Sequence, residues 1–442
     1  MKRLYSALFC SVLLISSCTN LENADPAQRK TFVKFYEGAS SMTAASIEPT
    51  EKGYIILANV EQTVDANTLF FTVVFEVDDQ GHRLGNFFSF PNGTGKSIKS
   101  LSNGGYVIVG DSISVQADAE QAANVTVSSL RTLIVNESFD LIRSFTLTDS
   151  NPNVNAIKED FFGGAVTVAA DGRIFILGTF KEGVVNQASA PEKQLLFVRN
   201  PDLSPNWSND FDLADNTYQN AKSVHLSPSG QVVWATAIAD IQGAFNRSWL
   251  AIPAVQDSAI YSNFSHFGQT TTQFMVPSDI QPAFNPSLGF GVVGTYSSQT
   301  DGSAGNMFFV RVRANGLIDP NTIRYFDGID SFNGTVAVDA AQSSILDQGK
   351  AICSTKDGGF LVAGTLVTNP QKGNGGKDIF LVKVNTFGSP IWMKTLGGIG
   401  DEEVTAVRLA KDGGLIVCGT NTIGDYSSVF LMKLDENGNL EN

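Results

Sequence analysis

Two stretches of the sequence, DGGFLVAGT from Asp357 and DGGLIVCGT from Asp412, align without a gap and start 55 residues apart. Each is a short apolar run that begins with Asp-Gly-Gly and ends with Gly-Thr. Asp and Gly tolerate the positive φ angles of tight hairpin turns, whereas Val, Ile, Leu and Phe favour strands. The motif therefore predicts a turn followed by a buried strand, and its recurrence indicates a repeat architecture.

Weaker copies of this motif run through the earlier part of the chain. They are GYIILAN from Gly53, GGYVIVGD from Gly104, DGRIFILGT from Asp171, SGQVVWATA from Ser229 and LGFGVVGT from Leu288. A second apolar motif follows every copy, with its clearest forms in DIFLVKV from Asp378 and VFLMKL from Val429. Both motifs occur seven times, at spacings of about 50–70 residues that fit the four-stranded blade of a β-propeller.

The order of strands within one repeat explains how the chain begins and ends. The segments PIWMKTLGG from Pro390, EVTAVRLAK from Glu403, GLIVCGT from Gly414 and VFLMKL from Val429 are expected as strands D, A, B and C. The chain stops soon after the last C strand, but Thr31–Gly38 matches the missing D pattern. We therefore expect an all-β fold over residues 31–442, a seven-bladed β-propeller with four-stranded blades. The N-terminal strand would pair with the last blade and close the ring, which removes an exposed sheet edge.

The last two repeats, from Lys350 to Asn442, resemble bacterial seven-bladed propeller repeats with the pattern DGGYIVAGT…DIFLVKVDSNGNxxWxKTFGG. Such repeats are common in envelope proteins of Bacteroidota. The resemblance implies a fold and no particular chemistry.

The first residues, MKRLYSALFCSVLLISSCTN, have the layout of an export signal. Lys2 and Arg3 precede an apolar run from Leu4 to Ile15 that is too short to span a bilayer comfortably. Leu14-Ile15-Ser16-Ser17-Cys18 resembles the bacterial lipobox, which implies removal of residues 1–17 and lipidation of Cys18. Residues 18–30 would then form a tether to the outer membrane, with the protein periplasmic or surface-exposed. An ordinary secretory signal with an incidental Cys is the alternative.

Composition limits the classes of partner. With 43% hydrophobic residues the chain can build a large core, which excludes disorder as its main state. Its net charge of −14 and lack of a basic run argue against nucleic-acid binding. No zinc-binding pattern, phosphate-binding loop or nucleophile elbow occurs, so we expect no metal, no cofactor and no catalytic residue. Cys353 and Cys418 could form a disulfide, or each could be a small buried apolar residue.

The long connections between expected strands all fall on one face of the predicted propeller. They are Ser112–Val127, Thr148–Gly163, Phe180–Lys193, Gly328–Gly349 and Val367–Lys377. Binding residues concentrate on loops above a rigid scaffold, so the acids of this face are the candidate ligand-binding residues. They are Glu159, Asp160, Asp327, Asp330, Asp401, Glu402 and Glu403. Such acids could bind Ca²⁺ or act as an acid–base pair on a sugar, although no fixed ligand spacing is present.

These observations predict a non-enzymatic envelope lipoprotein, a monomeric propeller that binds a ligand or protein partner at its loop-rich face. The alternative is a polysaccharide-binding or polysaccharide-active surface lipoprotein, either a hydrolase or a lyase. A third possibility is a structural envelope protein whose propeller only mediates assembly.

Overall fold

The computed structural model describes residues 30–64, 67–118, 123–147, 160–181, 192–211, 217–240, 248–256, 260–267, 274–297, 305–328, 347–367 and 376–440. Within these residues the chain is all-β, and its strands β1 to β28 are arranged in antiparallel sheets with one short 3-10 turn at Pro286–Leu288. The described part contains no helix that is long and apolar enough to cross a membrane.

Three sheets have four strands each, antiparallel and in sequence order. The first contains β2 (Met42–Pro49), β3 (Gly53–Val64), β4 (Asn67–Asp78) and β5 (Arg83–Pro91). The second contains β6 (Gly93–Ser100), β7 (Tyr106–Asp118), β8 (Ala123–Val135) and β9 (Leu141–Leu147). The third contains β10 (Asp160–Val168), β11 (Ile174–Lys181), β12 (Glu192–Arg199) and β13 (Pro205–Phe211).

The other strands form two larger sheets, and each of these consists of two four-stranded meanders joined by a single parallel residue pair. One sheet joins β14 (Thr217–Leu226), β15 (Val232–Asp240), β16 (Ser248–Gln256) and β17 (Ile260–Phe267) to β18 (Phe274–Pro282), β19 (Phe290–Ser297), β20 (Asn306–Val312) and β21 (Ile318–Phe326). The other joins β22 (Asp347–Ser354), β23 (Phe360–Val367), β24 (Lys377–Val384) and β25 (Pro390–Leu396) to β26 (Asp401–Leu409), β27 (Leu415–Ile423), β28 (Tyr426–Leu434) and β1 (Phe32–Tyr36).

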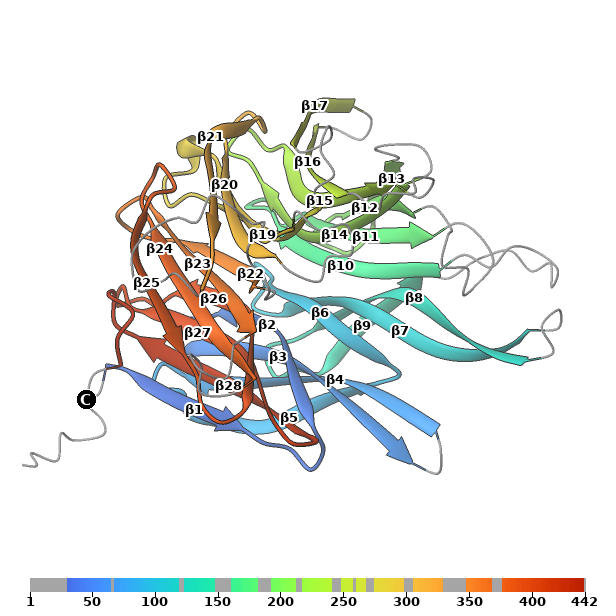
Figure 1. The fold of residues 1–442 in the computed structure, drawn as a ribbon. Coiled ribbons are helices and arrows are strands. Elements are labelled where there is room, and N and C mark those ends of the chain that lie inside the picture. The colour runs from blue at the N-terminus through green and yellow to red at the C-terminus, as the bar shows by residue number, and fades with distance from the viewer. Residues whose placement is uncertain are drawn as a thin grey trace, which may run out of the picture.

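The first described strand lies beside the last (Figure 1). β1 pairs antiparallel with β28, with Phe32 opposite Lys433 and Tyr36 opposite Val429. This is the pairing that the sequence predicts for Thr31–Gly38. Tyr36 is buried there, its hydroxyl donates to the Gly81 carbonyl at 2.8 Å, and its ring lies 5.0 Å from that of Phe75.

The first strands of the meanders lie next to one another in the middle of the molecule (Figure 1). β2 contacts β6, β6 contacts β10, β10 contacts β14, β14 contacts β18, β18 contacts β22, and β22 contacts β26. β26 in turn contacts β2. Apolar side chains fill the spaces between successive sheets, and the largest that are fully buried include Trp234, Phe75 and Phe290. Packing of one sheet on the next therefore buries the apolar faces of the strands.

The repeated Asp-Gly-Gly motif forms the turn between the first and second strands of a meander. In the last of these turns Gly413 has φ of 92°, and the amide of Gly414 donates to the Asp412 carboxylate at 3.1 Å. A residue with a Cβ is strained at such a φ, so glycine is required at this position.

One expected connection is largely strand. β7 and β8 extend through most of Ser112–Val127 and remain paired as far as Asp118 and Ala123. The prediction of a long loop there is wrong, because Ile113, Val115, Val125 and Val127 alternate with polar residues and so continue the strand pattern. The main parts of the other four connections, 148–159, 182–191, 329–346 and 368–375, lie outside the described residues.

Candidate functional site

A β-bulge interrupts the first strand of every described meander near its start. The register shifts by one residue at Ala45, Lys96, Gly164, Lys222, Ser278, Lys350 and Thr405. A bulge leaves one residue unpaired and turns its side chain away from the regular sheet direction. Because these strands surround the centre, the bulges place a set of residues around one axis.

A cavity of about 190 Å³ lies on this axis, and every first strand contributes to its lining. Two wider cavities, of about 490 and 400 Å³, adjoin it. Lys96 lines both the central and the larger outer cavity, Lys350 lines the central and the smaller outer one, and Thr405 lines all three. We refer to the three together as the axial funnel. It widens toward the starts of the first strands, which is the face predicted to carry the long connections.

Cationic side chains dominate the charge of the central cavity. Its lining includes Lys96, Lys99, Lys350 and Arg408, against one carboxylate, Asp279. Two of the cations are neutralised locally. The Nζ atom of Lys96 lies 2.7 Å from Oδ2 of Asp111, and that of Lys99 lies 3.0 Å from Oε2 of Glu48.

The other two cations have no such partner. Among the described residues, no carboxylate oxygen lies within 4.0 Å of Lys350 or Arg408. The Nη1 atom of Arg408 donates to the carbonyl of Val407 at 2.8 Å. Burial lowers the pKa of Lys350, and the nearby Lys377 lowers it further against the opposing effect of Glu403. An ammonium group with a lowered pKa is stabilised when an anion binds beside it.

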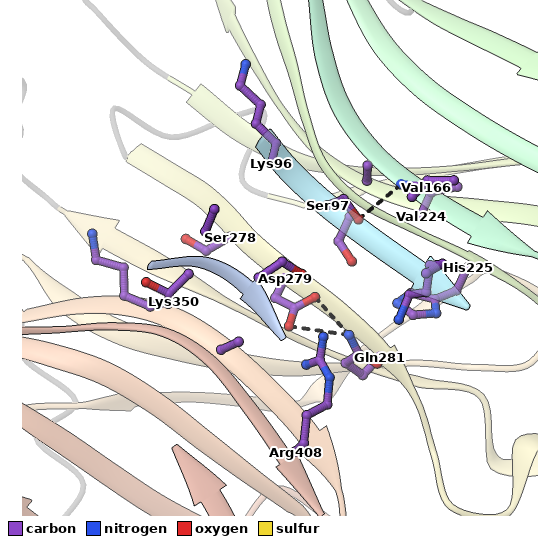
Figure 2. A pocket seen from close by; sticks show the side chains of 17 residues that line it. Lys96, Ser97, Val166, Val224, His225, Ser278, Asp279, Gln281, Lys350 and Arg408 are labelled. Carbon is purple, nitrogen blue, oxygen red and sulfur yellow. Dashed lines mark hydrogen bonds between the residues drawn. The ribbon is translucent and has the colours of Figure 1, made fainter. Parts of the chain in front are cut away.

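The narrow end of the funnel combines His225, Asp279, Gln281 and Arg408 (Figure 2). Gln281 donates to Oδ1 of Asp279 at 3.2 Å, and the amide of Ile352 donates to its Oδ2 at 3.2 Å. Burial raises the pKa of Asp279 although Arg408 opposes the shift. Burial, Lys99 and Arg408 lower the pKa of His225 to about 3, so its imidazole is neutral at neutral pH.

Three of the candidate acids, Asp401, Glu402 and Glu403, begin β26. Glu403 lines the smaller outer cavity and forms an ion pair with Lys377. Glu402 is buried and accepts a hydrogen bond from the amide of Gly398 at 3.0 Å. Burial raises the pKa of Glu402, and the charges of Asp378 and Asp401 raise it further.

The remaining candidate acids are dispersed. Asp327 follows β21 and lies close enough to another acid, Asp347, for its charge to affect the pKa of that residue. Burial and the charge of Asp327 raise the pKa of Asp347 to about 8, although its Oδ2 atom accepts from the Gly328 amide at 2.8 Å. Asp160 begins β10, and only its backbone is described. Glu159, Asp330 and the predicted lipid anchor Cys18 lie outside the described residues.

The funnel cations are functional candidates that the loop-based prediction missed. Lys96 and Lys350 each occupy the unpaired position of a bulge, and Lys222 holds the same position in β14. Alignment of the repeats on the first strand, instead of on the glycine-rich turn, would have placed three lysines in one column.

Cys353 and Cys418 are free and buried. Burial raises the pKa of Cys353 and of Cys418 to about 12. They therefore behave as small apolar residues, and the disulfide alternative is not formed.

No protein-family model and no curated protein matches the sequence. The fold, however, is similar to solved structures. An ulvan lyase of a polysaccharide lyase family, bound to -[GlcA(1-4)Rha3S]-, matches with a TM-score of 0.52 and 9% sequence identity over 92% of this chain and 97% of its own. A second structure of an ulvan lyase of this family matches with a TM-score of 0.51 and 9% identity over the same shares of the two chains. A Trypanosoma rangeli sialidase in complex with sialic acid matches with a TM-score of 0.43 and 12% identity over 82% of this chain and 57% of its own. The strand topology and the two ulvan lyase matches give the chain an all-β, β-propeller-like fold, and identities this low carry over no activity.

Proposed function

We propose that this chain is a saccharide-binding envelope lipoprotein and that its ligand enters the axial funnel. The observation that carries this proposal is the funnel itself. Three contiguous cavities are lined by the innermost strands and by polar groups that include Ser97, Gln281, Thr420 and Thr422. The outer cavities fall within the range of about 300–1,000 Å³ that is typical of small-ligand sites.

The proposed scaffold is a seven-bladed propeller with a closed ring. Each meander would be one blade, and β1 would supply the outermost strand of the blade that β26, β27 and β28 begin. The contact of β26 with β2 supports this arrangement. A closed ring would make the funnel rigid, because no sheet edge would remain free to shift.

The fold comparison favours a carbohydrate ligand over a protein partner. The ulvan lyase that this fold resembles is bound to a saccharide of glucuronic acid and sulfated rhamnose. Cavities of these volumes also accommodate a sugar chain better than a protein surface, which requires a broader area of contact. We propose binding and assign no catalytic step.

The position of the protein in the cell completes the proposal. Lipidation of Cys18 would anchor the chain to the outer membrane, with residues 18–30 as a tether. The funnel would then be presented to polysaccharides of the envelope or its surroundings.

Calorimetric titration of the full-length protein with a panel of neutral and acidic polysaccharides tests the proposal. At least one member of the panel should bind the wild-type protein. Thr405→Trp should abolish this binding, because Thr405 lines all three cavities. Thr43→Trp is a second blocking variant, because Thr43 is exposed and lines only the smaller outer cavity among the three.

The matched control is Leu141→Trp, which adds the same bulk at an exposed position of the outer strand β9. It should bind like the wild type. Absence of binding to every polysaccharide would overturn the proposal, as would unchanged binding by both blocking variants.

A further inference from the structure

The charged side chains that line the central cavity of this acidic protein are mainly basic. The chain carries a net charge of −14, but the central cavity gathers four cations on three different strands. Lys96 lies on β6, Lys350 on β22 and Arg408 on β26. A local cluster of one sign inside a low-dielectric cleft focuses the field on the ligand site.

Two of these cations, Lys350 and Arg408, form no ion pair within the described part of the chain, although Glu403 and Asp279 act on them at longer range. Among the described residues no carboxylate lies within 4.0 Å of either, whereas Lys96 and Lys99 form ion pairs. A partly buried cation without a partner costs free energy, because it has lost hydration without gaining a counter-charge. A bound anion would supply that counter-charge.

The carboxylates closest to these cations are already occupied. Asp279 accepts hydrogen bonds from Gln281 and from the amide of Ile352. Glu403 is paired with Lys377. These acids are therefore held by other partners. Lys350 and Arg408 both line the cavity, and among the described residues only Nη1 of the Arg408 guanidinium has a hydrogen-bond acceptor, the carbonyl of Val407.

Packing of the neighbouring sheet fixes the position of Lys350. Its bulge follows Gly349, where a Cβ atom would lie 2.3 Å from the Gly294 carbonyl of the preceding meander. Only glycine permits this close approach, so the backbone that carries Lys350 has little freedom to move. A preorganised cation loses less entropy on binding than a mobile one.

We propose that the funnel selects acidic saccharides, with Lys350 and Arg408 binding the oxyanion of the sugar, a carboxylate or a sulfate ester. This inference rests on the proposed saccharide-binding function and names its substrate class. The sugar rings would occupy the outer cavities, of about 490 and 400 Å³. The oxyanion would reach the narrower central cavity of about 190 Å³.

The test is calorimetric titration of the full-length protein with three tetrasaccharides of matched length and with inorganic sulfate. Tetragalacturonic acid supplies carboxylates, a carrageenan tetrasaccharide supplies sulfate esters, and its desulfated counterpart supplies neither. We expect at least one acidic tetrasaccharide to bind more tightly than the neutral one. The one that binds identifies the oxyanion, and added salt should weaken its binding.

Lys350→Met should then weaken binding of the acidic tetrasaccharide about 10- to 100-fold, the effect of losing one charge-assisted hydrogen bond. Lys350→Arg should retain most of the affinity. The control Lys356→Met removes the same charge from an exposed turn of the same meander and should have no effect. Thermal melting verifies that each variant is folded, and Arg408→Met provides a second, independent removal of charge.

The outcomes separate this inference from the proposed function. If the neutral tetrasaccharide binds as tightly as the acidic ones, acid selection is wrong and saccharide binding stands. If inorganic sulfate binds in a Lys350-dependent manner but no saccharide does, the anion site stands and saccharide binding is wrong. If both charge-removing variants bind an acidic tetrasaccharide like the wild type, Lys350 and Arg408 are not its ligands and the inference is overturned.

Discussion

The Nζ atom of Lys433 lies 2.7 Å from Oδ2 of Asp412, and this contact joins the two motifs of the repeat. Asp412 begins the glycine-rich turn motif, and Lys433 belongs to the apolar strand motif that follows it. The preceding meander repeats the contact, with Lys383 at 2.7 Å from Asp357. In these two meanders each motif supplies one half of an ion pair between a buried lysine and a half-exposed aspartate.

Asp412→Asn should therefore destabilise the protein. Lys433 is only 7% exposed and would lose its carboxylate partner. We expect the free energy of unfolding to fall by about 1–3 kcal/mol, measured by urea denaturation. Asp425→Asn, at an exposed turn, is the control and should change it by less than about 0.5 kcal/mol. Equal effects of the two substitutions would contradict a stabilising role for the contact.

Two adjacent residues of β1 should respond very differently to truncation. Tyr36 is buried against Phe75, so Tyr36→Ala should cost about 3–5 kcal/mol of unfolding free energy. Phe35 on the same strand is 52% exposed, and Phe35→Ala should cost well under half as much. Thermal or urea unfolding measures both. A Tyr36→Ala variant as stable as Phe35→Ala would show that β1 does not dock on β28 as described.

Asp347 should make stability depend on pH. In the unfolded chain its carboxyl has the ordinary pKa of 3.8, whereas burial raises the folded-state pKa to about 8. Between these values the folded protein retains a proton that the unfolded chain has released, so stability falls as pH rises through this window. This one group should contribute a loss of about 1.4 kcal/mol per pH unit in the middle of the window.

Asp347→Asn should remove that loss, because an amide does not titrate in this range. The difference in unfolding free energy between variant and wild type should grow in favour of the variant from about pH 4 to pH 8. Urea denaturation across this range measures it, with Asp425→Asn as the charge-matched control. A constant difference across the range would contradict the raised pKa.

Cys18→Ala should release the protein from the membrane fraction. Several acyl chains anchor a protein far better than one, and the substitution would remove the site that we propose for their attachment. Fractionation of cells by ultracentrifugation, followed by immunoblotting, measures the distribution. Continued retention of the variant in the membrane pellet would contradict lipidation at Cys18.

The strands were largely predictable from the sequence. In the segment GLIVCGT from Gly414, all residues after the glycine lie in β27, and PIWMKTL from Pro390 forms β25, because each is an apolar run bounded by turn residues. Such patterns encode local structure directly, since the apolar residues that become buried in a strand and the residues that form the flanking turns are adjacent in the chain.

The candidate site was much less predictable. Lys96 and Lys350 reach the axis because a bulge shifts the register by one residue, and no local pattern of hydrophobicity marks that shift. The net charge is an average over the whole chain, so it cannot reveal a basic interior. Asp401, Glu402 and Glu403 are predicted as acids of the loop-rich face, but the strand expected from Glu403 begins two residues earlier, at Asp401. In this strand Glu402 is buried and accepts a hydrogen bond from the Gly398 amide, and Glu403 is paired with Lys377.

The pairing of β1 with β28 also affects how the protein is made. β1 is synthesised about 400 residues before its partner β28, so the two strands cannot pair until β28 has also been made. Until then β1 and the edge of β27 remain open to other chains, and contacts so distant in sequence form slowly. A prematurely terminated chain would lack β28 and would keep both edges exposed, which makes truncated products recognisable to chaperones and proteases.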